Sequence, residues 1–485
     1  MLATQVLQQK QFRTIFFMEM WERYAFYGFQ TLFILFITHA KLPQDKAYSL
    51  FGIFTALLWM LPTIGGLLTD HIFGIKRSLL LGGLIFSLGY LVLTFASNLT
   101  TIITALCLIA IGNGFFKPMP AALLSRIYTN NPAGSKAAFT LYYMSINIGG
   151  IAASLAAPLI ALYFSYAWAF FLSVLGMLLG LANFILRKKL FKDLHNAADL
   201  KPFSLILLMK MLITVIILFI IAEALLHFLD ISFYLTIGLG LIAFAYLAAL
   251  AKAGESPAER FKHYVGILLM IEAIAFYIIY NQVFSTFILF AKSNVDLSIF
   301  AFKISPGNIT IFDGIGILIF SPILVKIYKS LAKHQIKITI ATKFAIGQLF
   351  AGLSILLLAV ISVLFAHHSY INLGWLVAVL FVFTIGELLV AALGLSMTAL
   401  YFPKRIIAFA MGAWFLAAAV SSALTGKFAQ LFAALPKSAT AAQSLHVYIN
   451  YFTHLGIISI IIGVIYLLIA RIVKVMASKR SIILD

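Results

Sequence analysis

Long apolar runs separated by short polar segments cover almost the whole chain. A helix needs about 20 mainly apolar residues to cross a bilayer. Fourteen runs reach that length: 14–40, 48–70, 78–97, 101–127, 137–164, 166–186, 203–229, 231–251, 263–291, 306–328, 340–366, 372–402, 406–433 and 447–473. They are too long and continuous for barrel strands, and in lipid only a helix satisfies all its backbone groups internally. The pattern therefore predicts an all-α integral membrane protein with 14 spans.

Two polar segments divide these runs. Residues 187–201 are basic, and residues 252–260 (KAGESPAER) contain Gly and Pro; one helical hairpin lies between them. Without the hairpin, six spans remain on each side, which is the outline of a major facilitator fold. The expected parts are an N-terminal six-helix bundle at 12–186, linkers and an inserted hairpin (spans 203–229 and 231–251) at 187–260, and a C-terminal six-helix bundle at 261–475.

The basic residues predict the orientation of the chain. With the N-terminus in the cytoplasm, 25 of the 34 Lys and Arg residues fall in cytoplasmic segments and 5 in outside loops, as the positive-inside rule expects. We therefore expect a multi-pass protein of the inner (cytoplasmic) membrane with both termini in the cytoplasm. The net charge of +19 then orients the protein in the lipid bilayer and does not indicate nucleic acid.

The amino-acid composition excludes several classes of protein. The chain is 63% hydrophobic and 10% charged, whereas a soluble domain has about 25% charged residues. A soluble enzyme, a nucleic-acid binder and a disordered protein are excluded as the main interpretation. HExxH, GxSxG and nucleotide-loop motifs are absent from the sequence, so we predict no catalytic residues, no enzyme activity and no metal site.

The first cytoplasmic loop, GGLLTDHIFGIKR (Gly65–Arg77), has features of a gating loop. Its glycines permit close helix approach, Asp70 stands at a helix end, and Lys76 and Arg77 lie at the level of the lipid headgroups. The plainer interpretation is an ordinary positive-inside loop.

Charged residues within spans are costly, at roughly +2.5 kcal/mol or more, and usually face a polar interior. Glu19, Glu22 and Arg23 lie along one side of the span at 14–40. Arg23 can pair with either carboxylate or grip a substrate carboxylate. Lys117 needs a carboxylate nearby, for which Glu19 or Glu22 is the natural candidate. The alternatives are a structural ion pair at Arg23 and a Lys117 side chain that reaches the membrane surface.

The second half contributes carboxylates instead. Glu387 is the only charge in the span at 372–402, and it can serve as a proton carrier or as the partner of a substrate ammonium. Asp313 is a lone carboxylate whose alternative role is to cap a helix break beside Gly314 and Gly316. A cavity with cations on one wall and carboxylates on the other would match a zwitterion.

Several motifs carry a family resemblance. EMWERYAFYG resembles the ExxER motif of the proton-dependent oligopeptide transporter (POT/PTR) family, and FFKP resembles its lysine motif. FTLYYMSINIGG resembles the F-Y-x-x-x-N-x-G signature, and GELLVAALGLS, FPKR and MGAWFLAAA resemble later spans. The match runs from about residue 12 to the end of the last span, and the inserted hairpin is similar to that of bacterial members.

The resemblance implies roles for particular residues. Those expected in proton coupling are Glu19, Glu22, Arg23 and Lys117. The expected substrate contacts are Arg23, Tyr27, Lys117, Asn147, Asn281, Asp313, Glu387 and Trp414; among these, Arg23 and Lys117 would contact the peptide carboxylate and Glu387 would hold the amine. Structural roles in helix packing remain open for Tyr27, Asn147 and Trp414.

Several positions depart from the family pattern. Asn281 stands where an acidic residue is usual and cannot carry a proton, and Asp313 aligns with an Asn. A further departure is the pair Tyr24, where Phe is common, and Phe26, where Tyr is common. We therefore hold two hypotheses: a proton-coupled symporter that imports di- and tripeptides, and a relative with another peptide-like, modified amino-acid or siderophore-like substrate and altered or absent coupling. In either case we expect a small zwitterionic substrate, protons as the energy source without a cofactor, and a functional monomer.

Overall fold

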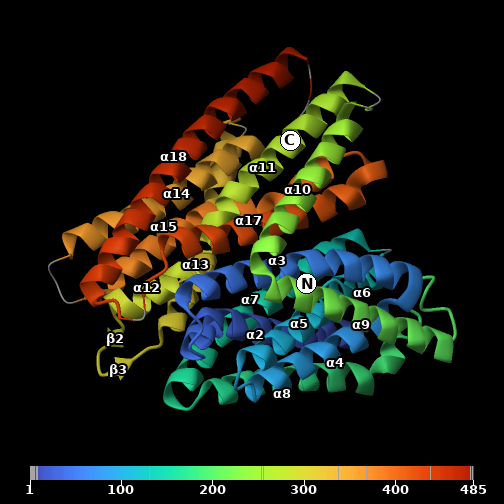
Figure 1. Cartoon of the computed structure of the whole chain (residues 1–485). Helices are drawn as coiled ribbons and strands as arrows, with labels where there is room; N and C mark the ends of the chain where they lie inside the picture. Colours follow the sequence, from blue (N-terminus) through green and yellow to red (C-terminus); the bar gives the residue numbers. More distant parts are fainter. Residues whose placement is uncertain are drawn as a thin grey trace. The chain divides into compact units, whose positions relative to one another are not determined.

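The computed structural model describes residues 6, 9–129, 131–252, 254, 256–336, 338–366, 370–436, 438–480, 482 and 484. Lys337 and Lys437, two of the basic residues counted above, lie outside the described residues. Nearly all regular structure in the described chain is helical (Figure 1). The exceptions are short pairs of strands in loops: β1 (Val295–Asp296) runs parallel to β4 (Ile371–Asn372), and β2 (Ser298–Ile299) runs antiparallel to β3 (Phe302–Lys303).

The helices before the inserted hairpin follow the predicted runs. They are α2 (Lys10–His39), α3 (Gln44–Leu68), the π-helical turn η1 (Thr69–Phe73), α4 (Ile75–Thr94), α5 (Leu99–Phe116), α6 (Met119–Ile127), α7 (Pro132–Tyr163), α8 (Tyr166–Leu186) and the short η2 (Lys188–Phe191).

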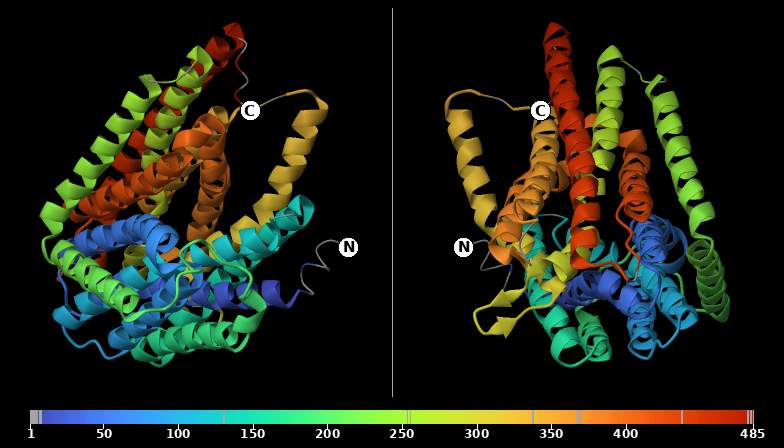
Figure 2. Two further views of the ribbon diagram at one scale, coloured as in Figure 1. Left: turned by 90° about the vertical axis from the view of Figure 1, so that its right-hand side faces the viewer. Right: turned by 60° about the vertical axis from the view of Figure 1, so that its left-hand side comes forward.

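The hairpin and the second half are equally helical. The hairpin consists of α9 (Leu205–His227) and α10 (Leu229–Lys252). The remaining helices are α11 (Pro257–Tyr280), α12 (Thr286–Asn294), η3 (Pro306–Ile309), α13 (Thr310–Lys333), α14 (Ile340–Leu364), α15 (Leu373–Val390), η4 (Ala391–Leu393), α16 (Gly394–Tyr401), η5 (Lys404–Ile406), α17 (Ile407–Phe432) and α18 (Ala441–Lys479). The longest, α18, has 39 residues and is drawn in red in Figures 1 and 2.

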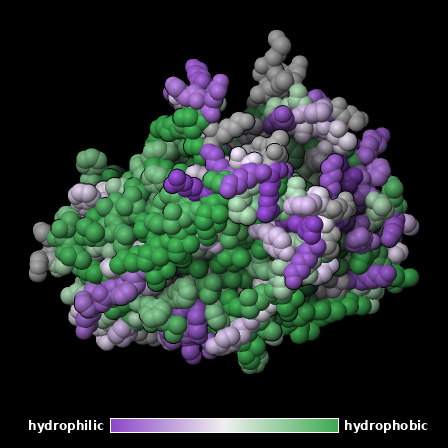
Figure 3. Space-filling model, turned by 90° about the horizontal axis from the view of Figure 1, so that it is seen from above, coloured by the Kyte–Doolittle hydropathy of each residue, from purple (hydrophilic) through white to green (hydrophobic). Residues whose placement is uncertain are grey.

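These helices confirm the predicted all-α membrane architecture. Within the described residues, 13 helical stretches are long and apolar enough to cross a bilayer. The remaining predicted span is α2, whose 30 residues would extend about 45 Å at 1.5 Å per residue. It differs from the others in carrying Glu19, Glu22 and Arg23. Figure 3 shows the large areas of hydrophobic surface that such helices present, as a bilayer requires.

Several predicted spans are broken helices. The run at 101–127 divides at Pro118, which lacks an N–H and starts α6 after α5 has ended. The run at 263–291 divides between α11 and α12, and the run at 372–402 divides at η4. Lys117 and Asn281 stand directly at two of these breaks, and Glu387 lies in the last turn of α15 before the third. Irregular backbone inside a membrane is typical of sites that line a polar cavity.

By internal packing the chain forms two compact units. The first comprises Met1–Leu42 and Leu57–Leu229, and the second comprises Pro43–Ala56 and Asp230–Asp485. Helix α9 packs on α5 in the first unit. Helix α10 belongs to the second unit, where Lys427 Nζ lies 2.8 Å from Asp230 Oδ1. The turn of the inserted hairpin is therefore also the boundary between the units, and each unit is described by itself below.

Candidate functional site

Helix α2 lies at the centre of the first unit and packs against α7 and α8. Small residues bring α7 unusually close to its charged side. A Cβ added to Gly149 would lie 2.3 Å from the backbone oxygen of Met20 and 2.9 Å from Arg23 Cβ. One turn along α2, Gly28 lies against Ala157. The INIGG sequence of α7 therefore places a backbone, rather than side chains, beside the charges of α2.

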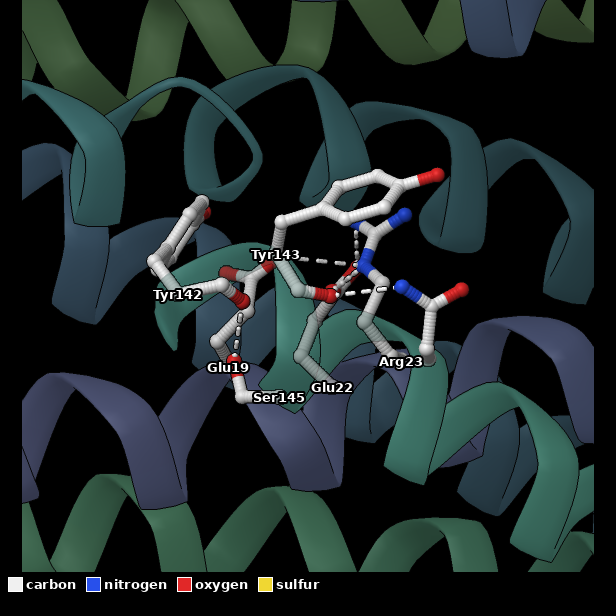
Figure 4. Close-up of polar contacts among 7 residues, drawn as sticks. Glu19, Glu22, Arg23, Tyr142, Tyr143 and Ser145 are labelled. Carbon is white, nitrogen blue, oxygen red and sulfur yellow. Dashed lines mark hydrogen bonds and ion pairs between the residues drawn. The ribbon is translucent and has the colours of Figure 1, made fainter. Parts of the chain in front are cut away.

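Arg23 is held by both neighbouring carboxylates (Figure 4). Its Nη2 donates to Glu22 Oε1 at 2.7 Å, its Nε contacts Glu22 Oε2, and the same Nε lies 3.1 Å from Glu19 Oε1. All three residues are buried: the exposed fraction is 0% for Glu22, 2% for Glu19 and 5% for Arg23. The three groups, if ionised, carry a net charge of −1 in a region with little water.

Side chains of α7 complete this cluster. The phenol of Tyr142 approaches the Glu19 carboxyl group. Asn147 Nδ2 donates to the backbone oxygen of Tyr143 at 2.8 Å, so this amide is held within its own helix. The ring of Tyr27 lies over Gly150, where a Cβ would come within 3.1 Å of its Cδ2 atom. Tyr27 of α2 thus packs on α7, and the role of Tyr27 and Asn147 as substrate contacts stays a prediction.

Lys117 is the second cation of the first unit, at the C-terminal end of α5. Its Nζ lies 4.5 Å from the centroid of the Trp59 ring and 5.5 Å from that of Phe26. Phe26 also faces Arg23, whose Cζ is 5.0 Å from the ring centroid. In the described part of the chain Lys117 forms no ion pair, although Glu22 and Glu19 are close enough to act on it electrostatically.

Aromatic faces therefore contact Lys117 directly, and the carboxylates that the sequence indicated, Glu22 and Glu19, lie near it without forming an ion pair. A cation over an aromatic face is stabilised by the ring quadrupole, so Lys117 stays at the buried cluster without a salt bridge. The sequence did not indicate two residues of this arrangement. Trp59 gave no signal in the sequence, and Phe26 was noted only for the hydroxyl that it lacks.

The predicted gating residues lie apart from this cluster, against the polar linker that follows α8. The Asp199 carboxylate accepts the backbone N–H groups of Ile75 and Lys76 at 3.0 and 3.3 Å, which caps the start of α4. Gly74 precedes them with φ of +85°, and a Cβ there would collide with Asp199. Asn196 reaches Asp70 Oδ1 at 3.4 Å.

Lys76 and Arg77 donate to backbone oxygens of the same linker. Lys76 Nζ lies 3.1 Å from the oxygen of Lys192, and Arg77 Nη1 lies 3.4 Å from that of Ala198. All three predicted gating residues thus contact the linker at 188–201. We name this arrangement of loop and linker, centred on Asp199, the linker latch.

In the second unit, Asp313 and Glu387 come together. Asp313 lies in the first turn of α13 and Glu387 in the last turn of α15. Their carboxyl groups are in hydrogen-bonding contact, and the Thr384 hydroxyl lies 2.7 Å from Asp313 Oδ1. A Cβ added to Gly316 would lie 2.8 Å from Thr384 Oγ1, so this glycine lets α13 and α15 approach. Neither carboxyl group forms an ion pair within the described residues.

Asn281 and Trp414 are held by internal contacts of the second unit. Asn281 ends α11 with 2% exposure, and its Nδ2 donates to the Tyr277 backbone oxygen at 2.9 Å and to Ser422 Oγ at 3.2 Å. The Trp414 ring packs edge-on against Tyr277, with centroids 5.9 Å apart. Tyr277 also acts electrostatically on Glu387. The structure therefore places Asn281 and Trp414 in contact with Tyr277, which in turn lies near Glu387 of the carboxyl pair.

Comparisons with known proteins agree with this arrangement. The family model described as the POT family matches residues 76–446. The dipeptide and tripeptide permease A of Cronobacter turicensis is 34% identical over 476 residues, which cover 97% of this chain and 94% of the relative. The chain belongs to the POT family. The resemblance drawn from the motifs is thereby confirmed.

Solved structures confirm the fold of this POT family member. Tetrameric PepTSo2 superposes with a TM-score of 0.85 at 28% identity, over 96% of this chain and 99% of that chain. A structure described as giving insights into substrate recognition in proton dependent oligopeptide transporters superposes with a TM-score of 0.82 at 29% identity, over 96% and 99%. The protein is a multi-pass membrane protein with the major facilitator fold, and its family is one of transporters.

Proposed function

We propose that the protein is a proton-coupled symporter that imports di- and tripeptides by alternating access. Its membership of the POT family and the relatives described as dipeptide and tripeptide permeases support this function. The neighbour described as a proton dependent oligopeptide transporter supports the coupling. The proton gradient supplies the energy, and no cofactor takes part.

The proposal rests on the contacts of the Arg23 guanidinium with two carboxylates, those of Glu22 and Glu19. The guanidinium is occupied by Glu22 and shared with Glu19, so it is not available to a substrate while both carboxylates are charged. A proton on either carboxylate removes one negative charge from this contact, and a neutral carboxyl group binds a guanidinium more weakly. Proton binding therefore releases Arg23 to grip a peptide carboxylate.

Lys117 provides the second positive charge of the peptide site. Because its Nζ rests on the faces of Trp59 and Phe26 without an ion pair among the described residues, a peptide carboxylate need not displace a competing anion from it. The peptide amine binds to the carboxyl groups of the second unit, Asp313 and Glu387. A zwitterion is thus recognised at both ends by opposite charges, and uncharged or singly charged compounds are disfavoured.

Transport by purified protein in liposomes tests the proposal. With an inward proton gradient, the wild-type protein should concentrate a labelled dipeptide. The Glu22→Gln variant should lose this accumulation and still exchange labelled for unlabelled dipeptide, because binding survives while the proton site is lost. Asp193→Asn, which removes an exposed carboxylate of the linker, is the matched control and should transport normally. Normal accumulation by Glu22→Gln would refute the mechanism.

We further propose an inner-membrane location, with both termini in the cytoplasm, and a functional monomer. The distribution of Lys and Arg supports the orientation. Reconstitution at less than one chain per liposome tests the monomer: transport that scales linearly with protein supports it, and transport that appears only in vesicles with several chains supports an assembly such as that of tetrameric PepTSo2.

The second candidate function, transport of another peptide-like compound with altered coupling, is favoured by Asn281. Its Nδ2 donates to the backbone oxygen of Tyr277 and to Ser422 Oγ, and an amide cannot carry a proton as a carboxylate does. A panel of dipeptides, modified amino acids and siderophore-like compounds, each competing with the labelled dipeptide, separates the two candidates. Strong competition by a non-peptide compound together with weak competition by every dipeptide would favour the second.

A further inference from the structure

Asp313 and Glu387 form the carboxyl pair of the second unit, and the proposed function does not say which of the two carries a proton. Asp313 is 7% exposed, and Glu387 Oε2 is buried and meets no hydrogen-bond donor in the described chain. Two ionised carboxylates in contact repel each other strongly where little water is present. A hydrogen bond between two carboxyl groups needs at least one proton, so at least one of the two is an acid.

Three observations decide which residue carries the proton. The Thr384 hydroxyl lies 2.7 Å from Asp313 Oδ1 and 2.8 Å from the backbone oxygen of Leu380, and an ionised Asp313 is the stronger acceptor for its one hydrogen. Asp313 lies in the first turn of α13, where the helix dipole favours a negative charge. Glu387 lies in the last turn of α15, where the dipole disfavours one.

The donorless oxygen agrees with the same assignment. Glu387 Oε2 has no hydrogen-bond partner among the described residues, so the oxygen that donates to Asp313 is Oε1, and a buried oxygen without a partner costs less on a neutral carboxyl group than on a carboxylate. We propose that Glu387 is a second proton site of the transporter, and that Glu387 donates its proton to Asp313, which is the carboxylate that receives the peptide amine. This inference rests on the proposed function and reverses the role of Glu387 that the family resemblance implies.

The surroundings of the pair fit this role. From α11 the phenol of Tyr277 faces Glu387, and from α14 the chain beside Gly386 contributes Gly347 and Phe350, which do not titrate. No Lys, Arg or His in the described chain pairs with either carboxyl group. The pair therefore has a charge of −1 with its proton in place. A peptide ammonium on Asp313 brings the sum to zero, which is the charge that crosses a low-dielectric interior at least cost.

The proposal predicts an asymmetry between two conservative variants. Glu387→Gln supplies an amide N–H where the acid O–H stood, so it imitates the protonated residue permanently. It should bind a dipeptide with an affinity within about threefold of wild type. Asp313→Asn removes the carboxylate that receives the amine and should lose at least tenfold in affinity, as expected for a lost charge-assisted hydrogen bond.

Calorimetric titration of the purified protein with a dipeptide measures both affinities, and thermal unfolding verifies that both variants fold. The opposite result, tenfold weaker binding by Glu387→Gln and near-normal binding by Asp313→Asn, would overturn the assignment. Equal affinities in both variants, or equal losses, would also overturn it.

Infrared difference spectroscopy gives a readout that does not depend on transport. The carbonyl band of a protonated carboxylic acid should be present in the wild-type protein and absent from Glu387→Gln. It should persist when the dipeptide is added, because the proton accompanies the substrate. Glu272→Gln is the matched control: Glu272 is another buried carboxyl group of this unit, with 1% exposure and an oxygen without a donor. Its removal should leave the Glu387 band in place.

The last measurement is the coupling of peptide transport to proton transport. Glu387→Gln should accumulate less dipeptide at a given proton gradient than wild type, with one proton fewer per peptide, and still carry out exchange. A wild-type protein that binds no dipeptide would refute the proposed function, while the infrared band would still report on the pair. Wild-type and Glu387→Gln spectra that do not differ would refute the inference alone.

Discussion

The two units place carboxyl groups in opposite electrical surroundings. In the first unit Glu19 and Glu22 share one guanidinium, and Lys117 lies nearby, so these four groups sum to zero charge when all are ionised. In the second unit Asp313 and Glu387 face each other, with a hydroxyl as their neighbour and no cation paired with them in the described chain. The same side-chain type is thus neutralised by cations in one unit and by a proton in the other.

This difference determines what a proton does in each unit. In the first unit a proton releases a cation, since it weakens the carboxylate hold on Arg23. In the second unit a proton stabilises an otherwise repulsive pair and leaves one negative charge for an amine. Changes that alter packing, charge or aromatic contacts in only one unit separate these two effects.

The largest effect should come from the close approach of α7 to α2 in the first unit. Gly149→Ala places a methyl group 2.3 Å from the backbone oxygen of Met20, and a backbone cannot move away as a side chain can. We expect a loss of about 3 kcal/mol in stability, the upper range for overpacking, together with loss of transport. Thermal unfolding in detergent measures the first and liposome uptake the second.

The second unit offers the matched comparison. Gly316→Ala brings a methyl group 2.8 Å from Thr384 Oγ1, which is a side-chain atom, so its cost should be smaller, at about 1 kcal/mol. Gly66→Ala is the neutral control because a Cβ there meets nothing within 4 Å. A Gly149→Ala protein as stable as Gly66→Ala would show that the contact of α7 with Arg23 is not tight.

The second-largest effect should come from Lys117, the cation without an ion pair in the described chain. Lys117→Ala should weaken dipeptide binding by about 10- to 100-fold, the range for a lost hydrogen bond to a charged group. Lys427→Ala removes another cation, whose partner Asp230 is exposed, and should change binding by less than about twofold. Calorimetric titration measures both, and similar losses in the two variants would indicate a general effect of net charge.

The sequence was sufficient for features that depend on one helix at a time. Hydropathy located 13 of the 14 predicted spans as long apolar helices, because each must be apolar over its own length. The spacing of Glu19 and Arg23 predicted their pairing, because residues four apart share a helix face. Contacts between helices could not be predicted from the sequence. Asp313 and Thr384, for example, are 71 residues apart, and no pattern within a single span links them. The breaks within predicted spans were not expected either: Pro118 stands at one of them, but the break after Tyr280 has no proline to mark it.

A smaller effect should follow from Trp59, which the sequence did not indicate. Trp59→Ala removes the nearer of the two rings under Lys117 Nζ. The loss of a cation–π contact of about 1 kcal/mol should weaken dipeptide binding about fivefold and leave the infrared band of the Glu387 acid unchanged. Trp59→Phe retains an aromatic face and should recover most of the affinity. Equal losses for Ala and Phe would assign Trp59 a role in packing alone.

The smallest effect should come from the linker latch, which contains neither site. Asp199→Ala removes the carboxylate that caps α4 through Ile75 and Lys76, and a lost helix cap costs about 1 kcal/mol. Dipeptide affinity at equilibrium should stay within about twofold, whereas the rate of uptake should change, because Asp70, Lys76 and Arg77 lose the linker that holds them. Asp193→Ala, on the same linker and exposed, is the control. An unchanged rate in Asp199→Ala, despite lower stability, would make the latch a purely structural contact and the gating role of this loop unsupported.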